Sequence, residues 1–380
     1  MAERRKIGLI YQYDENWIGG TYYIQNLVAA LNCLPERDKF ELVIFTEEDK
    51  QFDDLINTTK YPFISRGGYV VKLRFIKRLL NRLGRLVNNK NVFSVYNQDI
   101  DLVFPADRIT SFKKDQQFLY WIPDFQDHYL PEFFSENEIE RRKKTRDDII
   151  KNGKYIVFSS QTAKNDFNTI YPSNSLTRFV LNFAVTHPVL NDTLQIKEKY
   201  HLPDNYFICC NQFWKHKNHI TVLKAIQQLK QEGHSVFVAF TGKEYDDRHP
   251  DFFKELMETV KELGVANQVG FLGFISREDQ LSLMKESAAV IQPSLFEGWS
   301  TVIEDGKSLQ AKIIASDINV HREQLHNYSL SLLFGAQNKD ELAAALLTVN
   351  NISGTVACYK QNITAFAENF KVIFDTITSA

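Results

Sequence analysis

At 380 residues, the chain is longer than one hydrophobic core usually supports, so we expect two domains. A hydrophobic content of 44%, a charged content of 24% and a net charge of −2 are typical of a globular protein and argue against nucleic-acid binding. No apolar run approaches the roughly 18 residues of a membrane span, and the first residues lack a signal-peptide core. We therefore expect a cytoplasmic protein.

The first half of the chain begins with a strand, a glycine-containing turn, a helix and a second strand. We expect these strands at Lys6–Tyr11 and Phe40–Phe45, with the helix at Ile24–Leu31 between them. Further strands are expected at Leu102–Phe104, Phe118–Ile122 and Tyr155–Phe158. This alternation is typical of a parallel α/β sheet.

A second unit with the same alternation begins near Tyr206. Its strands are expected at Tyr206–Cys210, Val236–Thr241, Val269–Leu272, Ala289–Gln292 and Ile313–Ser316. Its helices are expected at Ile220–Lys230, Phe252–Leu263, Arg277–Ser287 and Thr301–Gln310.

The join between the two units falls near Asn182–Ile196, where Pro188 and polar residues break the periodicity. We expect two Rossmann-like, doubly wound parallel-sheet domains, residues 1–185 and 186–363, with ligands at the facing carboxyl ends of their strands. A last helix at Thr364–Ile377 has one apolar face, and we expect residues 364–380 to complete the first domain.

The strongest chemical signal lies between the expected strand ending at Gln292 and the helix that follows it. Glu297 and Gly298 fall in a tight loop at the carboxyl end of that strand. Ser300 and Thr301 fall at the helix N-terminus, where free N–H groups and the helix dipole suit a phosphate. On spacing alone, a capped helix without a ligand explains the same residues equally well.

The segment FEGWSTVIEDGKSLQAKIIASDI, with Glu297 and Asp305 separated by seven residues, resembles the donor-site segment of the family-4 (group 1) retaining glycosyltransferases of GT-B fold. That pattern has two glutamates at this spacing, with a glycine after the first. The resemblance implies that Asp305, or the adjacent Glu304, accepts the ribose hydroxyls of a donor nucleotide. Gln310 and Lys312 replace the usual Gly and Pro at the helix exit.

The loop that begins at Asn211 supports the same resemblance. It follows a strand, precedes a helix, and resembles the family loop whose Arg and Lys hold the donor diphosphate. Lys217 matches the lysine, and Asn211 opens the loop, whereas Gln212 stands where an arginine is common. We expect Lys215 or a basic residue elsewhere to supply the missing charge. Alone, the loop would be interpreted as a solvated charged turn.

Three weaker matches complete the expected site. Gly19 and Gly20 open the first helix, where glycine lets a backbone approach a diphosphate. Phe274 lies in a segment that resembles the family's contact with the nucleobase. Asp124 and His128 follow a strand of the first domain, near the place where relatives often have a His-Asp pair.

The resemblance implies transfer of a sugar, with retention, from a nucleoside diphosphate sugar to a hydroxyl of a glycan or lipid-linked acceptor, as in cell-surface polysaccharide or glycolipid synthesis. Glu297, Asp124 and His128 would be the catalytic residues. Lys217 and the helix N-terminus would stabilise the leaving diphosphate, with no metal or other cofactor. Two alternatives stay open: a sugar-nucleotide epimerase of the same fold and a non-catalytic sugar-nucleotide-binding protein. An oxidoreductase is disfavoured because the fingerprint G-x-G-x-x-G is absent.

No acidic residue occurs between Leu55 and Gln98, and Lys72–Lys90 combines basic residues with an apolar helical face. Such a segment suits either peripheral contact with the anionic inner face of the cytoplasmic membrane or a helix packed on its own domain.

Candidate metal ligands are few. Asp99 and Asp101 have a suitable spacing but directly precede a strand, and His216 and His219 lack an acidic partner nearby. The four cysteines lack metal spacing, so we expect buried free thiols at Cys33, Cys209, Cys210 and Cys358.

Overall fold

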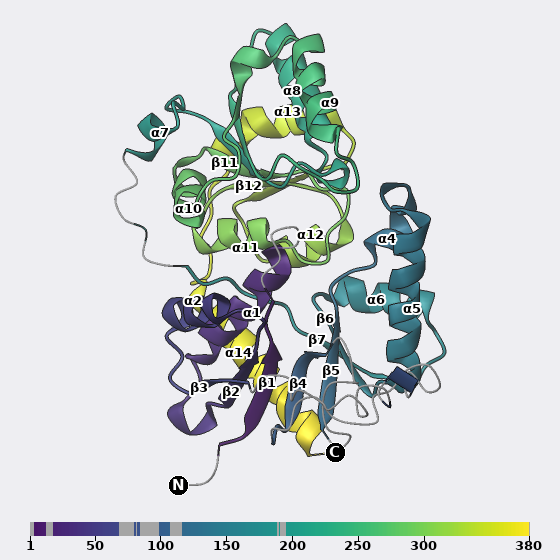
Figure 1. Cartoon of the computed structure of the whole chain (residues 1–380). Coiled ribbons are helices and arrows are strands. Elements are labelled where there is room, and N and C mark those ends of the chain that lie inside the picture. Colours follow the sequence, from purple (N-terminus) through teal and green to yellow (C-terminus); the bar gives the residue numbers. More distant parts are fainter. Residues whose placement is uncertain are drawn as a thin grey trace.

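A computed structural model of the chain describes residues 4–12, 18–67, 80, 82–83, 99–106, 116–187, 190 and 195–379. These residues form two α/β domains that lie one above the other in Figure 1. All strand pairs in both sheets are parallel, and their non-sequential order is that of doubly wound sheets. The predicted fold class is therefore confirmed.

The first domain is built on a seven-stranded sheet of order β3-β2-β1-β4-β5-β6-β7. The strands are β1 (Lys6–Ile10), β2 (Glu41–Phe45), β3 (Ile64–Arg66), β4 (Leu102–Ala106), β5 (Gln117–Ile122), β6 (Tyr155–Phe158) and β7 (Thr177–Val180). The helices are α1 (Ile18–Leu31), α2 (Asp49–Thr59), α4 (Gln126–Tyr129), α5 (Glu136–Asn152) and α6 (Gln161–Ile170). Figure 1 shows α4, α5 and α6 beside the sheet, with α4 and α5 rising toward the second domain.

The second domain has a six-stranded sheet of order β10-β9-β8-β11-β12-β13. The strands are β8 (Phe207–Cys210), β9 (Val238–Thr241), β10 (Val269–Phe271), β11 (Ala289–Gln292), β12 (Ile313–Ser316) and β13 (Ser331–Phe334). The helices are α7 (Ile196–Lys199), α8 (His219–Gln231), α9 (Phe252–Glu262), α10 (Arg277–Glu286), α11 (Thr301–Ser308), α12 (Asn319–Leu325) and α13 (Lys339–Thr348).

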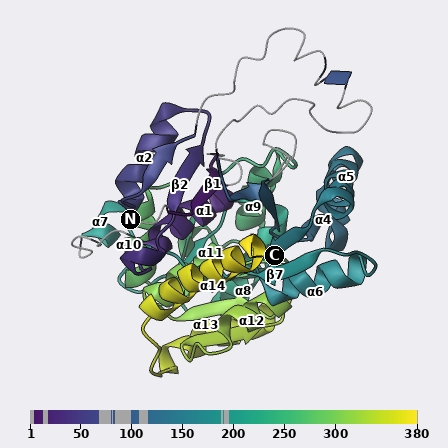
Figure 2. The same cartoon turned by 90° about the horizontal axis from the view of Figure 1, so that it is seen from below.

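The last helix, α14 (Lys360–Thr378), returns to the first domain, where it packs against α1. Figure 2 shows it in yellow, running across the molecule as seen from below. Phe366, Phe370 and Phe374 belong to the same buried cluster as Ile7 and Leu27. The core of the first domain is thus made from both ends of the sequence.

Serine residues fix the starts of several helices. Ser135, Ser160, Ser276 and Ser300 precede α5, α6, α10 and α11, and each side-chain oxygen accepts the N–H of the residue three positions later. This bond satisfies one of the N–H groups that a helix leaves unpaired at its first turn.

The predicted start of the first helix is wrong by six residues, because α1 begins at Ile18 and not at Ile24. Gly19 and Gly20 therefore lie in its first turn, in agreement with the expectation that they open the first helix. Glycine costs least near a helix end, where few intrahelical bonds depend on it, so its presence does not delay the helix.

The thiol prediction is half right. Cys209 and Cys210 are buried in β8, and desolvation raises the pKa of Cys209 to about 12. Cys33 and Cys358 are exposed, against expectation, although both are free thiols.

The basic segment Lys72–Lys90 lies outside the described residues, apart from residues 80, 82 and 83. Among the helices that the structure does describe, none has the length and apolarity to cross a bilayer.

Candidate functional site

A cavity of about 690 Å³ lies between the two domains. Five of its lining residues follow the carboxyl ends of strands: Asp124 follows β5, Ser159 follows β6, Asn211 follows β8, Lys243 follows β9 and Glu297 follows β11. This is the edge at which open parallel sheets bind ligands, and here two such edges face each other.

The cavity collects most of the predicted site residues. Those that line it are Gly19, Asp124, Asn211, Lys217, Glu297, Gly298, Ser300 and Thr301. Gly20, His128, Phe274, Glu304 and Asp305 lie outside its lining. His128 is exposed beside the ring of Tyr129, and Phe274 is 64% exposed on the loop before α10.

Lys217 and Glu297 form an ion pair inside the cavity. The Lys217 Nζ lies 2.6 Å from Glu297 Oε1, which also accepts the Gln292 side-chain N–H at 2.8 Å. The buried Asn211 amide donates in turn to Gln292 Oε1 at 2.8 Å. Both bonds to the carboxylate therefore end on Oε1, and Glu297 Oε2 has no partner among the described residues.

The N-terminus of α11 opens onto the same cavity. Ser300 caps the helix by accepting the Ile303 N–H, while its own N–H donates to the Gln324 side chain at 2.8 Å. Thr301 and Val302 also line the cavity, and an α-helix offers no backbone acceptor to N–H groups in its first turn. These groups and the positive end of the helix dipole favour an anion next to the Lys217–Glu297 pair.

Gly298 brings the two domains into contact. A side-chain Cβ at this position would lie 2.2 Å from the Pro123 carbonyl oxygen and 3.0 Å from the Asp124 Cβ. Any larger residue would push the loop after β11 away from the loop after β5. Gly19, by contrast, has no atom within 4 Å of its Cβ position among the described residues outside its own helix, so this side of the first turn of α1 is open.

Asp124 occupies the first-domain side of the cavity. Its Oδ1 accepts the Gln126 N–H at 3.0 Å, which fixes the start of α4. Desolvation raises the pKa of Asp124, and the Glu297 and Asp127 carboxylates add to the rise. The Gln126 N–H and Arg142 act in the opposite direction without cancelling it. Asp124 is therefore a carboxyl that holds its proton more tightly than usual.

Four basic residues in the cavity lining were not predicted. Lys243 and Arg248 follow β9, and Arg141 and Arg142 come from α5. Of the two predicted sources of the missing arginine's charge, Lys215 is not in the lining and lies 4.0 Å from Glu255, whereas basic residues from elsewhere in the chain do line the cavity. The only sequence signal for the β9 pair is the run KEYDDRH after a strand, which has no periodicity to mark it.

Arg248 is held between rings from both domains. Its guanidinium carbon lies 5.1 Å from the centroid of the Trp214 ring in the second domain and 4.8 Å from that of Phe134 in the first. Its Nε lies 3.4 Å from Asp246 Oδ1, which moderates its charge. Arg248 thus combines a cationic surface for the cavity with a contact across the cleft.

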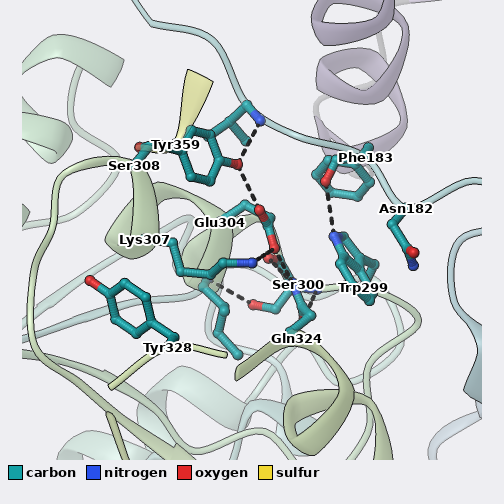
Figure 3. A network of polar contacts seen from close by, with 12 residues as sticks. Asn182, Phe183, Trp299, Ser300, Glu304, Lys307, Ser308, Gln324, Tyr328 and Tyr359 are labelled. Carbon is teal, nitrogen blue, oxygen red and sulfur yellow. Dashed lines mark hydrogen bonds and ion pairs between the residues drawn. The ribbon is translucent and has the colours of Figure 1, made fainter. Parts of the chain in front are cut away.

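The two predicted ribose contacts are held by protein groups. Asp305 is fully buried, is bonded to the Arg277 guanidinium and lies 3.7 Å from His187 Nε2. Glu304, only 1% exposed, accepts bonds from Lys307, Gln324 and Tyr359 (Figure 3). Neither carboxylate lines the cavity in this state of the protein.

The weak metal candidates serve the fold. The carboxylate of Asp101 accepts the Lys6 N–H at 2.7 Å, where β4 begins beside β1. The His219 ring packs 4.9 Å from Phe213, and burial lowers the pKa of His219 to about 3. Within the described ranges, no three His, Cys, Asp or Glu side chains are grouped to hold a metal ion.

Residues 192–364 match the family model of the glycosyl transferases group 1. A curated relative, the O-antigen chain mannosyltransferase RfbU of Salmonella typhimurium, is 25% identical over 210 residues, which span 53% of this chain and 55% of the relative. The alignment thus covers about half of the relative's length, and the family match covers the second domain.

Two solved structures resemble the whole chain. A glycosyltransferase from Rickettsia africae has a TM-score of 0.66 and 16% identity, with 98% of each chain covered. Anabaena HepE, solved in complex with UDP and glucose, has a TM-score of 0.64 and 18% identity, covering 98% of this chain and 95% of its own. At such identities the likeness shows the fold alone. The chain therefore has the GT-B fold, and its second domain matches the group 1 glycosyl transferases in sequence.

Proposed function

We propose that this protein is a retaining glycosyltransferase that moves a hexose from a nucleoside diphosphate sugar to an acceptor hydroxyl. The observation that carries the proposal is the Lys217–Glu297 pair beside the N-terminus of α11, in a cavity between two domains. A diphosphate is bound by cations and N–H donors, and a sugar is held by a carboxylate that accepts hydrogen bonds from its hydroxyl groups. The cavity lining contains both kinds of group: the Lys217 cation and the α11 N-terminus for the diphosphate, and the Glu297 carboxylate for the sugar.

The reaction breaks the bond between the anomeric carbon and the diphosphate and forms one to the acceptor oxygen. Lys217 and the N–H groups of Thr301 and Val302 would stabilise the charge that develops on the diphosphate. Glu297 Oε2 would accept hydrogen bonds from hydroxyl groups of the donor sugar and so fix the orientation of the sugar ring, while Oε1 stays bonded to Gln292. Lys243 and Arg248 would supply the charge that the loop lacks at Gln212.

Asp124 would lie on the acceptor side of the reacting carbon. It belongs to the first domain, it lines the cavity, and Gly298 keeps it close to the loop that carries Glu297. Its raised pKa suits a group that shares a proton with an acceptor hydroxyl. His128, exposed and outside the lining, is a weaker candidate for the same role.

The acceptor is proposed to be a growing cell-surface glycan or its lipid-linked precursor. The support is the match to an O-antigen chain mannosyltransferase over about half of its length. The likeness to a fold solved with UDP and glucose adds UDP-sugars to the donors to be tested. We propose that transfer needs no metal, so it should persist in excess EDTA.

The first test is a screen of thermal stabilisation by GDP, UDP, GDP-mannose and UDP-glucose. A ligand bound only by the folded protein raises the melting temperature. The donor so identified is then incubated with glycan acceptors, and the expected result is transfer that releases nucleoside diphosphate. Glu297→Gln should keep the fold and lose transfer.

The alternatives predict other products. An epimerase would convert the donor sugar without releasing nucleoside diphosphate, and a binding protein would be stabilised by the donor without turning it over. Stabilisation by none of the nucleotides, or full activity of Glu297→Gln, would refute the proposal.

A further inference from the structure

The chain passes between the two domains twice, and both passages are bonded to α11. The first crossing, residues 181–187, follows β7, and the second crossing, residues 352–359, precedes α14. Tyr359, the last residue of the second crossing, accepts the Val185 N–H at 3.0 Å. Its hydroxyl donates to Glu304 Oε2 at 2.6 Å. One phenol thus joins both crossings to the helix whose N-terminus opens onto the cavity.

The bonds continue from Glu304 to the start of α11. Glu304 Oε1 accepts Lys307 Nζ at 2.8 Å and the Gln324 amide N–H at 3.1 Å. The same Gln324 side chain donates to the Ser300 carbonyl at 3.0 Å and accepts the Ser300 N–H at 2.8 Å. Figure 3 shows this chain of contacts from Tyr359 through Glu304 and Gln324 to Ser300.

A second bond joins the first crossing to the cavity. The Trp299 indole N–H donates to the Phe183 carbonyl at 3.0 Å, two residues before Val185. Trp299 lines the cavity next to Gly298, and it also packs on the core of the first domain. The C-terminal end of the loop after β11 is therefore tied to the crossings in two ways, directly through Trp299 and indirectly through Ser300, Gln324 and Glu304.

We propose that Glu304 and Tyr359 are positioning residues that couple the crossings to the N-terminus of α11. The proposal rests on the proposed function, because it assigns them to the same site. A buried carboxylate that loses its donors is costly, so the bonds of Glu304 resist breaking. When the domains rotate about the crossings, α11 is carried along, and its N–H groups keep their place against the donor.

The state of the Tyr359 hydroxyl agrees with this role. Desolvation and the Glu304 carboxylate raise the pKa of Tyr359 above its usual range. The phenol therefore keeps the proton that it donates to Glu304 throughout the neutral range.

The chain offers a matched control. The Tyr328 hydroxyl is also buried in the second domain, where it donates to the Ala311 carbonyl at 2.6 Å and lies 3.4 Å from the Gly306 carbonyl of α11. Unlike the Tyr359 hydroxyl, it has no hydrogen bond to a described residue of either crossing. Tyr359→Phe and Tyr328→Phe each remove one buried hydroxyl. If the loss of a buried hydroxyl merely destabilises the second domain, hydrogen exchange should increase to the same extent in both variants.

The first experiment is hydrogen exchange on the ligand-free variants. A bond to a charged group protects by about ten- to a hundredfold, so Tyr359→Phe should speed exchange by at least about tenfold in residues 183–187 and 299–304. Tyr328→Phe should leave both segments within about twofold of the wild type. Unchanged exchange in 299–304, or an equal increase in Tyr328→Phe, would overturn the proposal.

The second experiment measures transfer with the donor from the screen. Tyr359→Phe should lower kcat by about tenfold while the Kd for the nucleoside diphosphate stays within about threefold, because phosphate contacts survive and only their placement degrades. Tyr359→Phe combined with Glu304→Gln should lose little more than the worse single variant. If the losses of kcat in the two single variants add up in the double variant, or if only KM rises, the coupling is refuted. A wild type without transfer refutes the proposed function instead, and the exchange experiment still decides the coupling.

Discussion

Lys217 is neutralised by Glu297 before any ligand arrives. A diphosphate entering the cavity must share the Lys217 Nζ with the carboxylate, so the net attraction comes from the neighbouring N–H groups and from Lys243 and Arg248. The pair also holds Glu297 in a fixed position, 12% exposed, ready for a sugar hydroxyl. Lys217 thus has two tasks, and its removal should affect both.

Lys217→Ala should weaken nucleoside diphosphate binding by about ten- to a hundredfold, the value of one charge-assisted bond. The loss should be larger for a diphosphate than for a monophosphate. Lys215→Ala is the matched control, since Lys215 lies on the same turn but is outside the cavity lining. Titration calorimetry with both nucleotides measures this, and equal losses in the two variants would remove Lys217 from the phosphate site.

We expect the Asp124 carboxyl to lower the stability of the folded protein at neutral pH while it supports transfer. Its pKa is higher in the folded than in the unfolded chain, so the unfolded chain binds fewer protons between the two values. Stability therefore falls as the pH rises through that window. Asp124→Asn avoids this loss and should raise stability at pH 7 by about 0.5–2 kcal/mol while lowering transfer about 100-fold or more.

The neighbouring acid provides the contrast. Asp127 is buried and makes a bidentate pair with Arg146 at 2.6 and 2.9 Å. Asp127→Asn breaks a buried ion pair and should cost about 3–5 kcal/mol. Urea denaturation of both variants at pH 5 and pH 7 separates the two signs, and a destabilised Asp124→Asn would contradict the pKa argument.

Among individual residues, the sequence predicted those whose type and spacing are typical of a phosphate- or sugar-binding site. Glu297, Lys217 and Ser300 each follow a strand end or start a helix, and the cavity collects them all. It did not predict Arg248, which lies over the Phe134 ring of the opposite domain, or Arg142, which lies over the same ring from within its own domain. Nor did it predict that Glu304 and Asp305 face protein donors, since those donors are distant in sequence.

Among the secondary-structure elements, buried strands were the most predictable. The bounds of β6, β11 and β12 agree with the predicted ones at both ends, because each is an apolar run between polar turns. The edge strand β13 and the helix α5 were not predicted. The former is partly exposed, and the latter is highly charged, so neither has a clear apolar period.

The exit of α11 carries backbone strain that a substitution can relieve. Gln310, at a position where the glycosyltransferases that this segment resembles usually have glycine, has φ of 55°, in the left-handed region. For a residue with a Cβ this conformation costs about 1–2 kcal/mol, whereas glycine adopts it freely. Gln310→Gly should therefore raise the stability by roughly 1 kcal/mol without changing transfer. Gln310→Ala keeps the Cβ and should change little, and a thermal melt of both variants checks this.

For the whole molecule, the sequence predicted two facing doubly wound domains, because alternating strands and helices leave few topologies. It could not predict the bonds between the domains. The Glu323 carboxylate accepts the N–H groups of Gln161 and Thr162 at the start of α6, more than 150 residues away in the chain. Such partners are set by the packed domains and have no local signal.

The basic segment Lys72–Lys90 leads to a prediction about membranes, made from the sequence alone. Basic residues near an anionic surface contribute about 1 kcal/mol each. Reversing Arg78, Arg82 and Arg85 to Glu should therefore release the protein from anionic vesicles at low salt while sparing nucleotide binding. Vesicle co-sedimentation measures the release.

A charge-matched reversal on α5, at Lys143, Lys144 and Lys151, controls for net charge. It should leave vesicle binding largely intact. If the wild type does not bind anionic vesicles at low salt, or if both reversals release it equally, the segment is no membrane contact.

The shared core of β1, α1 and α14 dictates an order of events during synthesis on the ribosome. The second domain is one continuous stretch, so its sheet can form as soon as β13 has emerged. The first domain is translated earlier, yet Phe366, Phe370 and Phe374 reach it only near the end. Until α14 emerges, the apolar side chains of α1 that it covers in the folded domain lack this partner, and exposed apolar surface of this kind is what chaperones bind. The part made first is therefore the part finished last.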